Sequence, residues 1–200
     1  MTTRPKVIVI HVGAPFNYAI PAVLERGGML EAFYTDMCAG RGLGRLARFG
    51  TWLPLIGRRL RLLSNRQPPP AVLAKTRTFD ISAMAGALLE SFAKTPDQVG
   101  RARHFSWACA AKMMRLRPLG DATHILSVYG QGNDFLGFAR SKGLRVVADV
   151  NIAPSFPNIV MDEQAAWPEW EPPLLGVSEP GFLKAQFSEI DLFICPSEFV

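Results

Sequence analysis

Short apolar runs alternate with longer amphipathic stretches along this chain. The runs have the length of buried strands and lie at residues 7–12, 30–35, 123–128, 145–150 and 192–195. Apolar residues at helical spacing occupy 18–27, which ends in two glycines, and recur in 97–116 and 133–141. Strand, helix and strand repeated in this order predict an α/β fold. We expect a doubly wound, mostly parallel, Rossmann-like sheet with helices on both faces.

Two segments interrupt this alternation. Residues 40–71 are basic and glycine-rich, and residues 151–180 are rich in proline and tryptophan. Loops of this length in a compact α/β domain are usually functional or disordered, and their apolar content argues against disorder. We therefore interpret residues 1–200 as one Rossmann-like domain with a basic insertion at 40–71 and a Pro/Trp-rich loop at 151–180.

The last ten residues predict a further element. The apolar run at 192–195 is followed by Pro196 and Ser197, and a serine at this point is a natural N-cap for a helix. The helix that Ser197 would begin needs more residues than the sequence contains. The pattern therefore favours the front portion of a longer protein.

Positive charge is concentrated in one segment. Residues 37–79 contain nine basic side chains and no acidic one, whereas the rest of the chain has thirteen basic and seventeen acidic residues. A basic surface indicates an anionic partner, either a phosphorylated substrate, an acidic membrane or a nucleic acid. Nucleic acid is not expected, because no helix-turn-helix, RNP or zinc signature accompanies the charge.

Leucines interleave with Arg58, Arg59 and Arg61 in this basic segment. An interfacial helix on an anionic membrane has this pattern. A helix pair that covers the sheet and turns its arginines to water has the same pattern. Both interpretations stay open, and these three arginines are the candidates for contact with an anionic surface.

The three cysteines are widely spaced and odd in number, and no metal-binding pattern joins them to the histidines. The sequence predicts reduced thiols, with no metal or cofactor. No apolar run approaches the length of about 20 residues that spans a bilayer. These features predict a cytoplasmic protein, with peripheral contact at the inner membrane face through the basic segment as an option.

Candidate binding residues follow three of the predicted strands, because ligands of open parallel sheets bind beyond the carboxyl ends of the strands. Gly13, Asn17 and Tyr18 lie in the turn after the first strand. Free N–H groups at the start of the next helix could hold a phosphate or a sugar hydroxyl there. A glycine required only by the turn geometry is the equally weighted alternative.

The other two strand ends carry amide and carboxylate side chains. Gln131 and Asn133 sit among glycines, where they could contact a ligand, although Asn133 could instead cap a helix. Asp149 ends a buried strand and precedes Asn151. A carboxylate in that position is costly unless it is paired or faces a cleft, and a role in capping a turn is the alternative.

Asp36 supports an alternative interpretation, a domain that binds a nicotinamide dinucleotide. It ends the second predicted strand, where nicotinamide-binding domains place the carboxylate that binds a ribose. The turn after the first strand lacks the G-x-G-x-x-G pattern of such domains, because Gly13 is its only glycine. A dinucleotide-dependent oxidoreductase domain therefore remains the runner-up.

Several of these motifs resemble one family. The turn from Gly13 to Tyr18, the segment 149–155 (DVNIAPS) and the segment 185–200 resemble parts of family 4 glycosyltransferases. The resemblance implies the N-terminal half of a GT-B enzyme, which has two Rossmann-like domains with the active site between them. Such hexosyl-type enzymes transfer a sugar from a nucleotide-sugar donor to an acceptor with retention and without a metal.

In that family the N-terminal domain receives the acceptor, and the C-terminal domain binds the donor and carries the E-x7-E carboxylates. The resemblance therefore implies that the donor domain is missing here, that the catalytic residues are unassigned and that the 200-residue fragment alone is inactive. Many relatives carry a histidine in the loop after the fifth strand, and none occurs here between Asp149 and Val200.

The leading hypothesis is the acceptor-side part of a retaining glycosyltransferase in glycan, glycolipid or polysaccharide synthesis. Its partners would be a nucleotide-sugar donor and a glycan or lipid-linked acceptor. A non-enzymatic module that binds anionic surfaces is a third hypothesis. The residues expected to line the acceptor cleft are Gly13, Asn17, Tyr18, Gln131, Asn133, Asp149 and Asn151.

Overall fold

The computed structural model describes residues 4–13, 15–50, 57–132, 134–150, 162–163, 165–167 and 187–195. Asn133, Asn151, most of the Pro/Trp-rich loop and the end of the chain from Pro196 on lie outside these residues.

Six strands form one parallel sheet. They are β1 (Val7–Ile10), β2 (Leu30–Thr35), β3 (Thr76–Thr78), β4 (His124–Val128), β5 (Arg145–Asp149) and β6 (Leu192–Ile194). The strand order is β3-β2-β1-β4-β5-β6, and every adjacent pair is parallel. The direction of winding reverses between β1 and β4, so the prediction of a doubly wound Rossmann-like sheet is confirmed.

Helices cover both faces of the sheet because side chains alternate along each strand. Ile8 and Ile10 of β1 pack in one cluster with Met114 of α5 (Pro96–Arg115) and Phe135 of α6 (Asp134–Ser141). The opposite face of β1 packs Val7 and Val9 against α1 (Ala19–Arg26) and α3 (Pro70–Lys75). All four residues of β1 are buried, as expected for a central strand with helices on both sides.

Local signals explain where two of the predicted helices begin. Thr95 caps α5, because its hydroxyl accepts a hydrogen bond from the Gln98 backbone N–H, and Pro96 occupies the first turn. Helix α1 starts only at Ala19, since Asn17 and Tyr18 adopt left-handed backbone angles at the end of a 3-10 turn (η1, Pro15–Tyr18).

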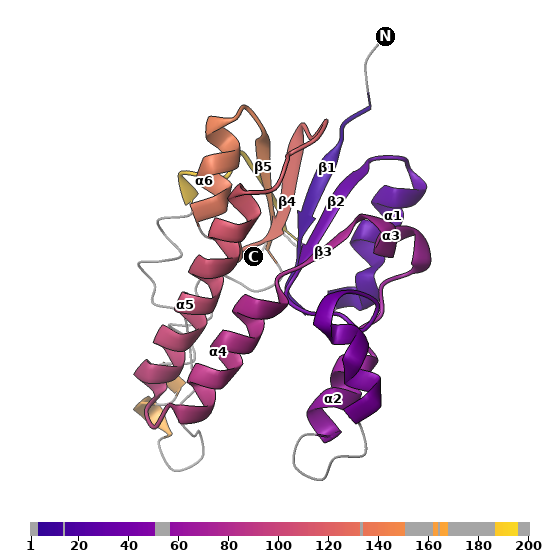
Figure 1. Ribbon diagram of the computed structural model, residues 1–200. Coiled ribbons are helices and arrows are strands. Elements are labelled where there is room, and N and C mark those ends of the chain that lie inside the picture. The colour runs from indigo at the N-terminus through magenta and orange to yellow at the C-terminus, as the bar shows by residue number, and fades with distance from the viewer. Residues whose placement is uncertain are drawn as a thin grey trace.

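The region between β2 and α5 contains five described elements, of which the sequence pattern suggested only one or two helices in the basic segment. They are η2 (Gly42–Gly50, a 3-10 helix), α2 (Gly57–Ser64), α3, β3 and α4 (Asp80–Phe92). Helices α4 and α5 lie side by side, and together with α2 they project beyond the carboxyl edge of the sheet (Figure 1). In the described part of the chain, no helix has both the length and the apolar character to cross a membrane.

Candidate functional site

Two side chains join the turns at the carboxyl ends of the central strands. The Oε1 atom of Gln131, after β4, accepts a hydrogen bond of 3.0 Å from the backbone N–H of Val12, after β1. The neighbouring N–H of Gly13 donates to Oδ1 of Asp36, after β2, at 2.9 Å. The structure therefore brings together the predicted Gly13 and Gln131 at the point where the strand order reverses.

Asp36 is the centre of this arrangement. Its Oδ1 atom also accepts from the Thr35 hydroxyl at 3.1 Å, and its Oδ2 atom forms an ion pair of 3.1 Å with Arg66. Both carboxylate oxygens are thus engaged within the protein. The N–H groups of Val12 and Gly13 are engaged as well, so the first turn offers neither of these donors to a phosphate.

Asn17 and Tyr18 separate from this cluster. Asn17 is exposed, whereas the ring of Tyr18 is buried and packs edge-on against Phe33 with centroids 5.7 Å apart. Burial raises the pKa of the Tyr18 hydroxyl, which has no hydrogen-bond partner in the described structure. Tyr18 is therefore part of the core beneath α1 rather than part of the strand-end surface.

Asp149 is the last residue of β5, next in the sheet to β4 and its following turn. Partial burial raises the pKa of its carboxyl group above the ordinary value. Tyr129, Phe187 and Phe193 form a cluster of rings near this strand end, with centroids 5.3 to 6.3 Å apart. The two remaining predicted residues, Asn133 and Asn151, lie outside the described residues.

Beside the Gln131–Asp36 cluster lies a groove of about 270 Å³. The ends of β1 and β2 contribute Ile10, Val12 and Tyr34, while α4 and α5 provide the walls through Ala83 and Trp107. The sequence pattern did not reveal this groove, because it did not predict α4. The small residues within 82–87 of α4, with Gly86 against Ser106 of α5, are the signal that could have indicated a closely packed helix pair.

His11 is a further residue that the sequence did not single out. It follows β1, is 1% exposed, and neither ring nitrogen has a hydrogen-bond partner in the described structure. Burial without a partner lowers its pKa to about 4, because desolvation disfavours the charged imidazolium. His11 is therefore neutral at pH 7.

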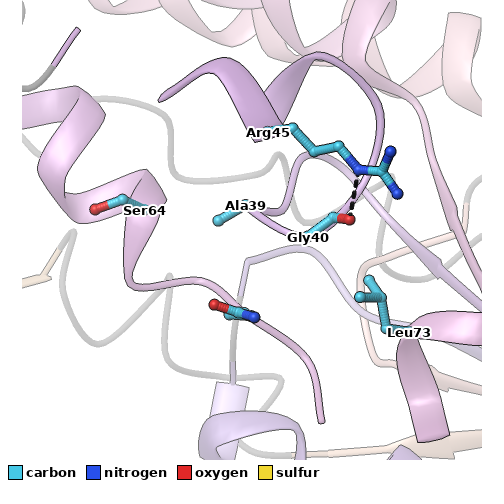
Figure 2. A pocket seen from close by; sticks show the side chains of 6 residues that line it. Ala39, Gly40, Arg45, Ser64 and Leu73 are labelled. Carbon is cyan, nitrogen blue, oxygen red and sulfur yellow. Dashed lines mark hydrogen bonds between the residues drawn. The ribbon is translucent and has the colours of Figure 1, made fainter. Parts of the chain in front are cut away.

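A second cavity, of about 250 Å³, lies within the basic segment. Figure 2 shows Ala39, Gly40 and Leu73 around it, with Ser64 from the end of α2. Nε of Arg45 donates a hydrogen bond of 2.9 Å to the carbonyl oxygen of Gly40. This arginine therefore helps to hold the loop that forms the cavity.

Other basic side chains of the segment also bind the protein itself. Arg41 donates to the carbonyls of Leu73 and Ala74 in the last turn of α3, and Arg66 pairs with Asp36. The side chains of Arg58 and Arg59 lie outside the described structure, and Arg61 is exposed on α2. Arg41 and Arg66 are therefore only partly exposed and bind groups of the protein itself.

No protein-family model, curated protein or solved structure matches this chain. Among the described residues, no three histidine, cysteine, aspartate or glutamate side chains lie close enough together to hold a metal ion.

Proposed function

We propose that this chain is the acceptor-side domain of a retaining glycosyltransferase that uses a nucleotide-sugar donor. The observation that carries the proposal is the groove at the carboxyl edge of β1 and β2, beside the reversal of strand order. Open α/β sheets bind their ligands at this place. The motif resemblance to family 4 glycosyltransferases supplies the reaction class.

The hydrogen bonds of the first turn favour this function over dinucleotide binding. A dinucleotide domain needs N–H groups of that turn for the pyrophosphate and the carboxylate after β2 for the ribose. Here Gln131 and Asp36 accept from the N–H groups of Val12 and Gly13, and Arg66 pairs with the Asp36 carboxylate. The same atoms are therefore committed to holding the strand ends in place.

In the proposed reaction this domain positions the acceptor. A donor-binding domain outside these residues would hold the nucleotide-sugar, and no catalytic group is assigned here. Gln131 holds the turn after β4 through its Oε1 atom. Its Nε2 group has no protein partner in the described structure and lies at the switch point, the place between β1 and β4 where the strand order reverses. We expect that amide to contact an acceptor hydroxyl.

The test uses the protein encoded by the complete reading frame. It is incubated with UDP-, GDP- and ADP-sugars and with lipid and glycan fractions, and release of nucleoside diphosphate is measured. We expect acceptor-dependent release with one donor, reduced at least tenfold by Gln131→Ala and unchanged by Gln67→Ala. Tight binding of NAD or NADP without any sugar transfer would instead establish the oxidoreductase alternative.

Peripheral contact with an anionic membrane is a second proposed property. Leu43, Leu46 and Phe49 of η2 recur every three residues, which places them on one face of a 3-10 helix, and all three are exposed. Arg61 on α2 is exposed as well, and α2 packs against η2. Exposed apolar side chains beside arginines favour the interface of an anionic bilayer.

Cosedimentation with vesicles tests this contact. We expect the protein to bind phosphatidylglycerol vesicles more strongly than phosphatidylcholine vesicles, and the double substitution Leu46→Ser with Phe49→Ser to abolish binding. Leu116→Ser, at an exposed leucine just after α5, is the matched control. Equal binding by the double variant and the control would exclude η2 as the contact.

A further inference from the structure

Most polar side chains that line the groove between the sheet edge and the α4–α5 pair already have partners within the protein. Six of its polar side chains already bond within the protein. Thr35 donates to Asp36, Ser82 donates to the carbonyl of Phe79, Ser106 donates to the carbonyl of Ser82, and Glu90 pairs with Arg103. In the described structure, the hydroxyl of Tyr34 and the indole N–H of Trp107 are the side-chain hydrogen-bonding groups of the lining that have no partner.

A sugar ring does not fit this inventory. Each sugar hydroxyl that leaves water must recover a hydrogen bond, and an unpaired buried hydroxyl costs about 1–3 kcal/mol. Two groups, both on aromatic rings, are the unpartnered ones, and the other polar side chains of the lining would have to share their capacity with bonds they already make. The hydrophobic side chains of the lining include Ile10, Phe79 and Met114, which belong to one apolar cluster with Tyr34. The lining therefore favours an apolar ligand.

The shape of the groove indicates which kind of apolar ligand it could bind. Its lining follows α4 from Phe79 to Glu90, which at 1.5 Å per residue is about 16 Å. Its volume of about 270 Å³ is below the range of about 300–1,000 Å³ that encloses a whole small-molecule ligand. A long and narrow space of this volume fits one extended aliphatic chain. Such a chain would be one part of a larger ligand.

The outer face of α4 is apolar as well. Ile81, Met84, Leu88 and Phe92 are exposed at a spacing of three or four residues, so they form one stripe along the helix. On the inner face, Gly86 lets α5 approach closely, since a Cβ at Gly86 would lie 2.6 Å from Cβ of Ser106. Helix α4 thus presents apolar surface both to the groove and to the outside.

We propose that this groove binds the aliphatic chain of a lipid-linked acceptor. The inference rests on the proposed glycosyltransferase function and names its acceptor class. The chain would lie along α4 between the sheet edge and α5. The polar end of the acceptor would then reach the switch point, where Val12 lines the groove and bonds to Gln131.

A homologous series of probes tests the chain site directly. Hexyl, heptyl and octyl β-glucosides, each below its micelle concentration, are titrated into the protein by calorimetry. Each added methylene should lower Kd about fourfold, the factor that corresponds to about 0.8 kcal/mol per buried methylene. Glucose itself should not bind. Equal affinities across the series would overturn the proposal, because the head group would then determine binding.

Three alanine-to-leucine variants of α4 locate the binding site. Ala83 and Ala87 line the groove, whereas Ala85 lies on the same helix outside the lining. We expect Ala83→Leu and Ala87→Leu to weaken octyl glucoside binding at least tenfold, and Ala85→Leu to leave Kd unchanged. Thermal unfolding shows whether each variant folds. Ala87 is exposed, so Ala87→Leu should fold and can still test the site if Ala83→Leu does not fold. Groove variants that bind like Ala85→Leu would overturn the site.

The two proposals fail in different ways. Chain-length-dependent binding without transfer from any nucleotide-sugar would contradict the glycosyltransferase function and leave an aliphatic site. Transfer to an acceptor without an aliphatic chain, together with unchanged kinetics in the Ala83→Leu and Ala87→Leu variants, would contradict the chain site alone.

Discussion

Gln131 and Val12 join two strand ends that are 119 residues apart in sequence, through a hydrogen bond of 3.0 Å between the Gln131 Oε1 atom and the Val12 N–H. The bond spans the position where the strand order reverses, between β1 and β4. This side chain therefore links the two turns that border the proposed acceptor site, in addition to the pairing of β1 with β4.

Gln131→Ala should lower the free energy of unfolding by about 1 kcal/mol, because the partly buried Val12 N–H loses its acceptor. Gln131→Glu keeps an acceptor oxygen and should recover stability, but it removes the Nε2 donor, so transferase turnover should stay low. Urea unfolding and nucleoside diphosphate release measure the two effects. Recovery of turnover in Gln131→Glu would show that the donor has no part in acceptor binding.

Asp36 and Arg66 should contribute unequally to stability. Asp36→Ala removes the acceptor for the Gly13 N–H, the acceptor for the Thr35 hydroxyl and the ion pair, which predicts a loss of about 2–3 kcal/mol. Arg66→Ala removes only the ion pair, whose side chains are 40% and 23% exposed, so the loss should stay below about 1 kcal/mol. Urea unfolding of both single variants and the double variant measures the coupling. Equal losses would mean that the bonds from Gly13 and Thr35 to Asp36 together contribute nothing.

The sequence was sufficient for the fold wherever apolar residues carried the pattern. Strands β1, β2, β4, β5 and β6 and helices α1, α5 and α6 lie where the apolar runs and the caps predict them. Strand β3 reads Thr-Arg-Thr and contains no apolar residue, so no hydropathy pattern could reveal it. It pairs with β2 at the edge of the sheet, where backbone hydrogen bonds define a strand without apolar side chains.

The candidate site was predicted less completely than the fold. The rule that ligands bind at strand ends located Gly13 and Gln131. It could not reveal that Asp36 binds Gly13, since hydrogen-bond partners depend on the register between distant strands. Arg66 and Asp36 are 30 residues apart, and a count of charges in the basic segment could not reveal that they form an ion pair. The sequence pattern therefore could not predict which polar side chains form hydrogen bonds and ion pairs within the protein.

Gly44 is expected to be irreplaceable within the basic segment. A Cβ atom at Gly44 would overlap the carbonyl oxygen of Cys38, a backbone atom that cannot move aside cheaply. Gly44→Ala should therefore lower the free energy of unfolding by about 1–3 kcal/mol, the usual cost of overpacking. Gly100→Ala is the matched control, because that position in α5 has open space and alanine favours a helix by about 1 kcal/mol. A stabilised Gly44→Ala variant would contradict the contact between Gly44 and Cys38.

The buried His11 predicts a loss of stability in acid. The folded protein holds its pKa at about 4, below the ordinary value of 6.5, so below pH 6.5 the unfolded chain binds a proton that the folded chain does not. The free energy of unfolding should therefore fall as the pH decreases from 6.5 to about 4, by about 3 kcal/mol in total from this residue. His11→Leu removes the titrating group and should flatten this part of the profile of unfolding free energy against pH. If His11→Leu and the unaltered protein lose the same stability between pH 6.5 and pH 4, His11 is not neutral in the folded state, and another group causes the acid sensitivity.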